Sequence, residues 1–343
     1  MKRVVWLLAV LPCFAHCQPK PLPDPVQKVE CLDLLQMQKE SKETIATNIG
    51  KWGLVIPLIE AHWKKVDELI KTDALHTGAD FYVASLEAGD VMNFLEHQEL
   101  AHELAITSLL LDEPNAPALV ARSWDRLITA TGRLPRLGTT FSYDFEKKTP
   151  IPAPLDPDAI SSIAQVLLNP EEAKKTANSA TDSKELADIR AADQKEREGD
   201  MSKPMSDEES MAWSKRDRDR QARVLEILKA GGAKNAKDYE AAALVLQHSS
   251  KFEGYELAHE LCLASLALGS KEAAWLVSRT YDRMLLAAGY RQRYGTNSNM
   301  RGLMPYSEGI NDRMRRLASV KPLAEQIKNG EEWRKKVLES TKG

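Results

Sequence analysis

Two histidines and an aspartate in the second half of the chain are the residues best suited to acid–base chemistry. His248 follows a glutamine, His259 lies between glutamates in the run ELAHEL, and Asp282 precedes Arg283. A histidine and a carboxylate within hydrogen-bond reach are typical of general acid–base catalysis. No Ser or Cys nucleophile in a recognisable turn accompanies them. A hydrolase-like enzyme that uses these residues is therefore an alternative hypothesis.

His259 could also be a metal ligand. Glu256 lies one helical turn before it and could orient the imidazole or help to hold a metal. A zinc protease needs another histidine four residues after the first, and Leu263 stands there. We therefore predict no metal and no other cofactor. The competing role for His259 is a buried histidine that is hydrogen-bonded to a neighbouring helix.

The loop from Gly289 to Asn297 reads GYRQRYGTN and concentrates hydrogen-bond donors. Such a set could hold a carboxylate or a phosphate, although the Gly-Lys-Ser/Thr of a P-loop is missing. The alternative is a surface loop whose tyrosine packs back on the preceding helices. The candidate ligand-binding residues are His248, His259, Asp282, Arg283, Arg291, Gln292, Tyr294 and Thr296.

Arg279 stands three and four residues before Asp282 and Arg283, respectively. On a helix this spacing allows an ion pair within the helix itself. The functional alternative is a charged wall of a cleft that binds an anionic ligand.

Residues 256–297 are a second version of residues 99–140, which align with them without a gap at an offset of 157. Twenty of the 42 aligned positions are identical, including the run ELAHEL, an Asp-Arg pair and a Gly-Thr pair. Helical periodicity alone would match only the apolar positions, so we interpret the chain as a tandem duplication. The first copy has apolar residues at several polar positions of the loop, and we therefore expect any function in the second copy.

The apolar spacing around these motifs predicts helical hairpins. Helices are expected over 96–111 and 116–131 and again over 253–268 and 272–288, each hairpin closed by a glycine. Asp80 is expected to cap the helix that precedes the first hairpin. No convincing series of β-strands is found. The predicted fold is all-α, with two related units of helical hairpins joined by a charged helical connector.

Composition and spacing divide the chain into five parts. We predict a signal peptide (1–17), an N-terminal extension (18–50), a first helical repeat unit (51–170), a charged helical linker (171–220) and a second helical repeat unit (221–343). Hydrophobic residues make up 43% of the 343 residues and charged residues 28%. These fractions are typical of a folded globular protein. A net charge of −3 lacks the basic excess of a nucleic-acid binder.

The first 17 residues have the pattern of a secretory signal. Lys2 and Arg3 precede an apolar run that is too short to span a bilayer. We therefore expect an exported protein, periplasmic or secreted in a bacterium, without a transmembrane segment. A lipid anchor at Cys17 is the minor alternative. Cys31 and Cys262 could pair in an oxidising compartment, but the apolar surroundings of Cys262 favour a buried free thiol.

The second copy resembles a bacterial family known as domain of unknown function 6624. The residues that carry the resemblance are Asp238-Tyr239, Gln247-His248, Asp282-Arg283, Gly289, the run Gln292 to Thr296, Arg315-Arg316 and Pro322-Leu323. Asn297 stands where the family pattern has a glutamine. The first half keeps only a few of these positions. The resemblance implies a helical domain, present in tandem, and supplies no reaction because the family has none established.

The leading hypothesis is an exported, non-catalytic binding module for a peptide, a protein or a small anionic ligand. Its basis is a pair of helical units with a donor-rich loop and no assembled catalytic set. The alternatives are the hydrolase-like enzyme and a purely structural envelope protein.

Overall fold

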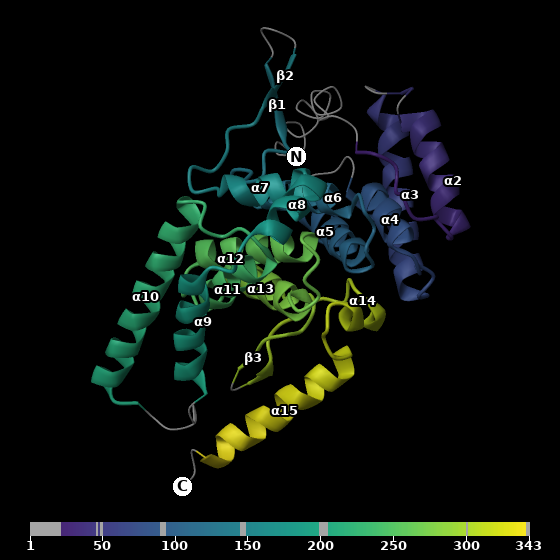
Figure 1. Cartoon of the computed structure of the whole chain (residues 1–343). Coiled ribbons are helices and arrows are strands. Elements are labelled where there is room, and N and C mark those ends of the chain that lie inside the picture. The colour runs from purple at the N-terminus through teal and green to yellow at the C-terminus, as the bar shows by residue number, and fades with distance from the viewer. Residues whose placement is uncertain are drawn as a thin grey trace. The chain divides into compact units, whose positions relative to one another are not determined.

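A computed structural model describes residues 22–45, 47–48, 51–89, 94–144, 149–198, 205–299 and 301–340. The predicted signal peptide, Cys17 included, lies outside these residues. Helix makes up 66% of the structure and strand 3%. The prediction of an all-α protein is therefore confirmed (Figure 1).

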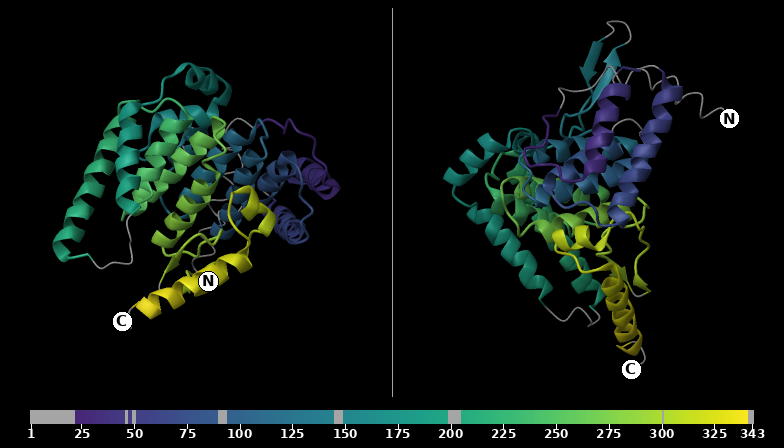
Figure 2. Two further views of the ribbon diagram at one scale, coloured as in Figure 1. Left: turned by 60° about the horizontal axis from the view of Figure 1, so that its bottom comes forward. Right: turned by 90° about the vertical axis from the view of Figure 1, so that its right-hand side faces the viewer.

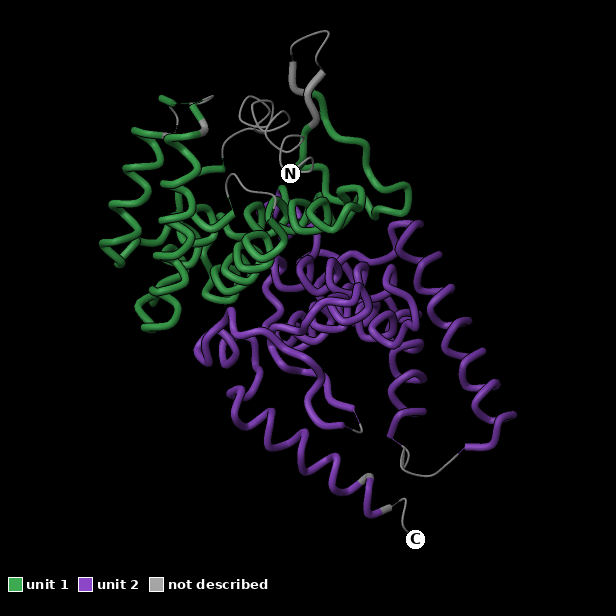
Figure 3. Tube along the Cα trace, turned by 180° about the vertical axis from the view of Figure 1, so that it is seen from behind, with its two compact units in different colours: residues 1–168 green, residues 169–343 purple. Residues whose placement is uncertain are grey.

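The chain divides into two compact units, residues 1–168 and 169–343 (Figure 3). The first contains α2 (Leu32–Glu40), the π-helix η1 (Ser41–Ile45), α3 (Trp52–Lys71), α4 (Gly78–Gly89), α5 (Leu95–Leu110), α6 (Ala116–Ala130), β1 (Phe141–Asp144), β2 (Thr149–Pro152) and α7 (Ser161–Leu168). The second contains α8 (Pro170–Ser179), α9 (Lys184–Arg197), α10 (Asp207–Lys229), α11 (Ala236–Leu246), α12 (Phe252–Ala267), α13 (Ala274–Ala287), β3 (Ser298–Asn299), β4 (Gly302–Leu303), α14 (Asp312–Leu317) and α15 (Leu323–Ser340). The charged segment 171–220, predicted to be a connector, thus belongs to the second unit.

One central helix organises the core of each unit. α5 packs between α4 and α6, and α12 packs between α11 and α13. Both central helices are buried on nearly every side, so their polar side chains need partners inside the protein. Ser108 donates to the carbonyl of Gly78 at 2.7 Å, and Ser265 donates to that of Ala236 at 2.9 Å.

A buried aspartate joins an upstream helix to the start of each core. Asp80 accepts the backbone N–H groups of Glu30 and Cys31, just before α2, at 2.8 and 2.9 Å. Asp238 accepts the N–H of Ser183, just before α9, at 2.7 Å. The N-cap of α4 is Thr77, whereas the sequence had suggested Asp80: the Thr77 hydroxyl accepts the N–H of Asp80 at 3.0 Å. The carboxylate of Asp80 in turn accepts the N–H groups of His76 and Thr77 at 3.0 and 2.9 Å, so Asp80 completes a capping box.

The helices α9 and α10 lie side by side and are held by ion pairs (Figures 1 and 2). Arg197 contacts Asp217 at 2.7 Å, and Glu196 accepts from Arg216 at 2.5 Å and from Arg220 at 2.7 Å. A capping box between Ser206 and Glu209 starts α10. This network explains how a segment with few large apolar residues forms an ordered pair of helices.

Two short antiparallel ladders are exceptions to the all-helical prediction. β1 pairs with β2 and β3 pairs with β4, and each ladder follows the Gly-Thr loop of its unit. Strands of two to four residues are too short to produce a recognisable alternation in the sequence. In the second unit α15 packs on β3 and β4 (Figure 2).

Cys31 and Cys262 are both free thiols, and Cys262 is buried, as the sequence favoured. Burial raises the pKa of the Cys262 thiol well above its usual range. In the described part of the chain, no helix is both long enough and apolar enough to cross a lipid bilayer.

His62 holds three elements of the first unit together. Its Nδ1 lies 2.9 Å from a carboxylate oxygen of Glu87 on α4, and its Nε2 lies 3.2 Å from a carboxylate oxygen of Glu40 on α2. The Ser41 hydroxyl donates to the same oxygen of Glu87 at 2.6 Å. Burial by itself lowers the pKa of His62, but the hydrogen bonds to Glu87 and Glu40 outweigh it and raise the pKa above 6.5.

This arrangement predicts a pH-dependent contribution of His62 to stability. Because the pKa is higher in the folded than in the unfolded protein, the stabilisation is full below the unfolded pKa of about 6.5 and disappears as the pH rises through the folded value. We expect His62→Gln to lower the free energy of unfolding by about 1–2 kcal/mol at low pH and by less at high pH. Urea unfolding between pH 5.5 and 9 measures this difference. His76→Gln, at an exposed position, is the control, and a pH-independent cost for His62→Gln would contradict the assignment.

Candidate functional site

The carboxylate of Asp282 organises the donor-rich loop that follows α13. One oxygen accepts the backbone N–H groups of Arg293 and Tyr294 at 2.7 and 2.9 Å. The other accepts the N–H of Thr296 at 2.9 Å and its hydroxyl at 2.8 Å. The side chain of Asp282 is fully buried, which raises its pKa, while the four donated hydrogen bonds oppose that rise. Asp282 therefore acts as the anchor of the loop.

The first unit has the same anchor at positions 157 residues earlier. Asp125 accepts the N–H groups of Arg136, Leu137 and Thr139 at 2.8 Å each and the Thr139 hydroxyl at 2.7 Å. The glycine before each threonine has a positive φ, 75° in the first unit and 81° in the second. A residue with a side chain is strained there, which explains the Gly-Thr pair in both loops. The tandem duplication itself stays a prediction.

His259 is a buried histidine between α12 and α13. Its Nδ1 lies 3.1 Å from the carbonyl oxygen of Val277 and 3.2 Å from the hydroxyl of Thr280. Burial lowers its pKa to about 3, so the imidazole is neutral at physiological pH. In the first unit His102 makes the corresponding contact with Ser123 at 2.9 Å. This geometry favours the structural role over a ligand or acid–base role.

His248 pairs with a residue that the sequence did not single out. Its Nδ1 lies 3.1 Å from a carboxylate oxygen of Asp193 on α9, and Asp193 is buried. Burial lowers the pKa of His248, although the hydrogen bond to Asp193 opposes this shift. The three residues of the enzyme hypothesis thus have separate partners: Asp193 for His248, α13 for His259 and the loop for Asp282. The sequence does not mark Asp193 as a partner of His248, because it is one of many acidic residues in the charged segment.

Arg283 connects α13 to the end of α11 and to the loop. Its Nη1 donates to the backbone oxygen of Gln247 at 2.6 Å and to the side-chain oxygen of Gln247 at 3.1 Å, and its Nε donates to Asn297 at 3.3 Å. All three acceptors are neutral. The intrahelical ion pair that the sequence suggested for Arg279 and Asp282 is absent from the described residues, because the carboxylate of Asp282 accepts from the loop instead.

The remaining predicted loop residues mostly point inward. Gln292 is fully buried and donates to the carbonyls of Asn297 and Met304 at 2.9 Å each. Tyr294 is also fully buried, and its ring packs edge-on against Tyr281. The expected packing of Tyr294 against the helical hairpin is therefore present, and the donors of Gln292 and Thr296 are used within the protein.

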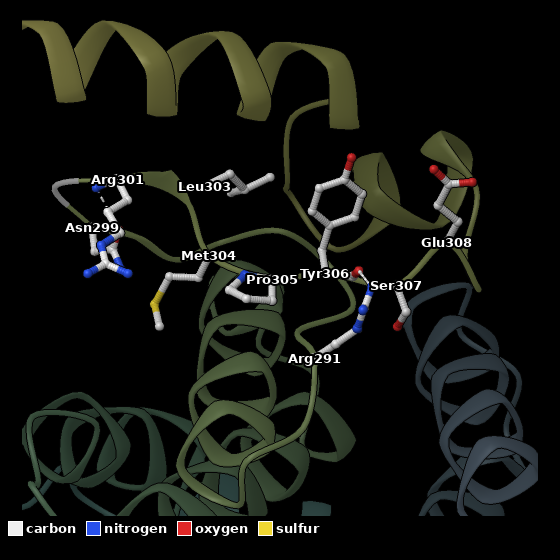
Figure 4. A pocket seen from close by; sticks show the side chains of 9 residues that line it. All are labelled: Arg291, Asn299, Arg301, Leu303, Met304, Pro305, Tyr306, Ser307 and Glu308. Atoms are coloured by element: carbon white, nitrogen blue, oxygen red, sulfur yellow. Dashed lines mark hydrogen bonds between the residues drawn. The ribbon is translucent and has the colours of Figure 1, made fainter.

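Arg291 points outward into a pocket with a volume of about 750 Å³ (Figure 4). Its guanidinium donates to the backbone oxygen of Tyr306 at 3.4 Å. The pocket is lined by Arg291, Asn299, Arg301, Leu303, Met304, Pro305, Tyr306, Ser307 and Glu308. Of the eight predicted site residues, Arg291 reaches this pocket. The sequence did not indicate the others that line it, because they follow the recognisable motif.

Three charged side chains line this pocket, and Arg291 lies beside Tyr306 and Ser307 (Figure 4). In Figure 4, Arg301 lies at one end and Glu308 at the other, with the apolar side chains of Leu303, Met304 and Pro305 between them. Among the residues that the structure describes, no group of three or more His, Cys, Asp or Glu side chains is placed to hold a metal ion. The chemistry that the pocket offers is recognition of a ligand with charged ends.

Comparison with known proteins gives no relative: no family model, no curated protein and no solved structure matches the chain. The resemblance to the domain of unknown function 6624 family therefore stays a prediction.

Removing the charge of Asp282 tests its role as the loop anchor. We expect Asp282→Asn to destabilise the second unit by about 3 kcal/mol, because an amide cannot accept all four hydrogen bonds and turns its own donors toward backbone N–H groups. Asp125→Asn should have a similar cost in the first unit. The exposed Asp219→Asn makes the same chemical change and should cost less than about 1 kcal/mol. Urea unfolding measures all three, and equal, small effects would contradict the anchor.

Proposed function

We propose that the chain is an exported, non-catalytic binding module whose second unit holds a short peptide in the pocket between Arg301 and Glu308. The observation that carries this proposal is that Arg301 and Glu308 lie at opposite ends of the 750 Å³ pocket, with apolar side chains between them. Pockets of about 300–1,000 Å³ with a few placed polar groups are typical of ligand sites. The charged and apolar residues of the first 17 positions support the export.

The charged groups of the pocket are available to a ligand. Within the described residues, neither Arg291 nor Arg301 forms an ion pair with a carboxylate, and Glu308 has no cationic partner. A free carboxylate of a ligand would gain charge-assisted hydrogen bonds from a guanidinium, and an ammonium group would gain one from Glu308. A peptide with both termini free carries these two groups.

The floor of the pocket is held in place before any ligand arrives. The N–H of Gln292 donates to the carbonyl of Pro305 at 3.0 Å, and the N–H of Ser307 donates back to the carbonyl of Gln292 at 3.0 Å. The side chain of Gln292 adds the bond to Met304. Such preorganisation lowers the entropic cost of binding.

The proposal is for binding rather than hydrolysis because two members of the enzyme hypothesis are committed elsewhere. The imidazole of His259 has a pKa of about 3, and the carboxylate of Asp282 accepts four hydrogen bonds from its own loop. A purely structural envelope protein would need no charged pocket.

Calorimetric titration with three forms of one tripeptide tests the proposal. The probes are alanyl-leucyl-alanine with free termini, its N-acetyl form and its C-terminal amide. We expect the free peptide to bind best, with each blocked terminus weakening binding about tenfold. Arg301→Gln should remove the advantage of the free carboxylate, and Glu308→Gln should remove that of the free ammonium.

The exposed Arg218→Gln on α10 removes the same charge outside the pocket and should leave all three affinities unchanged. Equal binding of the three probes, or no binding at millimolar concentration, would refute the peptide proposal.

A further inference from the structure

The helix α13 carries two arginines one turn apart on the same side, Arg279 and Arg283, and both are half-buried. Residues four apart on a helix are neighbours, so the two positive charges repel each other. Neither guanidinium lines the pocket of Arg291 and Arg301. This pair therefore needs an explanation of its own.

No carboxylate in the described part of the chain compensates these two charges. Arg283 donates only to the neutral oxygens of Gln247 and Asn297, and Arg279 has neither a hydrogen-bond nor an ion-pair partner among the described residues. The pKa of Arg283 is lowered to about 10, mainly by burial and in addition by the nearby charge of Arg279. Burial likewise lowers the pKa of Arg279.

Two further groups near Arg283 act on its pKa in opposite directions: Tyr255 raises it, and Arg197 on α9 lowers it. The guanidinium of Arg197 is itself paired with Asp193 and Asp217 at 2.7 Å each. Asp193 also accepts a hydrogen bond from His248, so its carboxylate is engaged away from Arg283. A half-buried cation without a counter-charge is costly, and such costs are retained mostly where a ligand removes them.

We propose that Arg279 and Arg283 form a binding site for a small oxyanion, a phosphate or carboxylate group, on the face of α13 beside Gln247. The guanidinium fork presents parallel N–H donors that match the paired oxygens of such groups. As far as the structure describes the chain, the whole fork of Arg279 is available to such a group. Arg283, whose Nε and Nη1 donate to Asn297 and Gln247, adds its Nη2 and a second positive charge.

The corresponding arginines of the first unit lie in a different setting. Arg122 and Arg126 line a cavity of about 10 Å³, room for about one water molecule. Arg126 donates to the carbonyl of Gly89 at 2.8 Å, as Arg283 does to that of Gln247. A cavity that holds about one water molecule leaves no room for a phosphate or carboxylate group beside Arg122 and Arg126. We therefore propose the oxyanion site for the second unit.

The site is also joined to the floor of the peptide pocket. Arg283 donates to the side chain of Asn297, whose N–H donates to the side-chain oxygen of Gln292 at 2.9 Å. Gln292 in turn holds the backbone of Met304 in the pocket floor. The oxyanion site does not depend on peptide binding, and its failure would leave the peptide proposal standing.

Thermal unfolding of the full chain tests this site. The probes are inorganic phosphate and succinate at low millimolar concentration, compared with potassium chloride at matched ionic strength. We expect at least one oxyanion to raise the melting temperature of the wild type, and the comparison tells a phosphoryl from a carboxylate preference. Arg279→Gln and Arg283→Gln should each abolish the shift. Arg279→Lys keeps the charge without the fork and should weaken anion binding about tenfold.

A structural role for Arg279 predicts the opposite behaviour of the unliganded protein. If it is a ligand residue without an internal partner, Arg279→Gln melts at the same or a higher temperature than the wild type in chloride. Arg218→Gln is the charge-matched control and should keep the full shift. The proposal is overturned if neither oxyanion shifts the wild type, if Arg279→Gln retains the shift, or if that variant melts well below the wild type in chloride.

Discussion

The second unit depends on one buried carboxylate that receives four hydrogen bonds from its own chain. Asp282 fixes the amides of Arg293, Tyr294 and Thr296, and in doing so it fixes the path of the whole loop after α13. A buried charge is tolerated when its hydrogen-bonding capacity is filled, and here the loop fills it. These hydrogen bonds give the outer face of the loop a defined shape. Gln292 then ties that loop to the segment that forms the pocket floor.

The polar residues of the second unit fall into two groups with different physical roles. One group, to which His259 and Thr296 belong, forms hydrogen bonds within the protein and holds the helices and the loop together. The other group keeps charge without an internal counter-charge, as Arg279 and Arg301 do within the described residues. The first group makes the scaffold rigid, and the second supplies the charges that could recognise a ligand. Both proposals rest on the second group.

Much of the scaffold could be predicted from the sequence, because apolar spacing determines buried helix faces. The helix expected over 253–268 is α12, which runs from Phe252 to Ala267. The role of Asp282 could not be read in the same way. The sequence shows an aspartate followed by a loop rich in hydrogen-bond donors. It does not show whether those donors bind a ligand or the aspartate itself. Asp193 and Glu308 were missed because their positions depend on contacts distant in the chain, and no local pattern marks them.

Hydrogen exchange of individual backbone amides tests the central claim most directly. If the carboxylate of Asp282 holds the loop, the amides of Arg293, Tyr294 and Thr296 exchange as slowly as those in the middle of α13, although they lie outside any helix. Gly289, which bonds only to a helix-end carbonyl, serves as the internal reference for an ordinary loop amide. Exchange of the three amides at the rate of Gly289 would contradict the account.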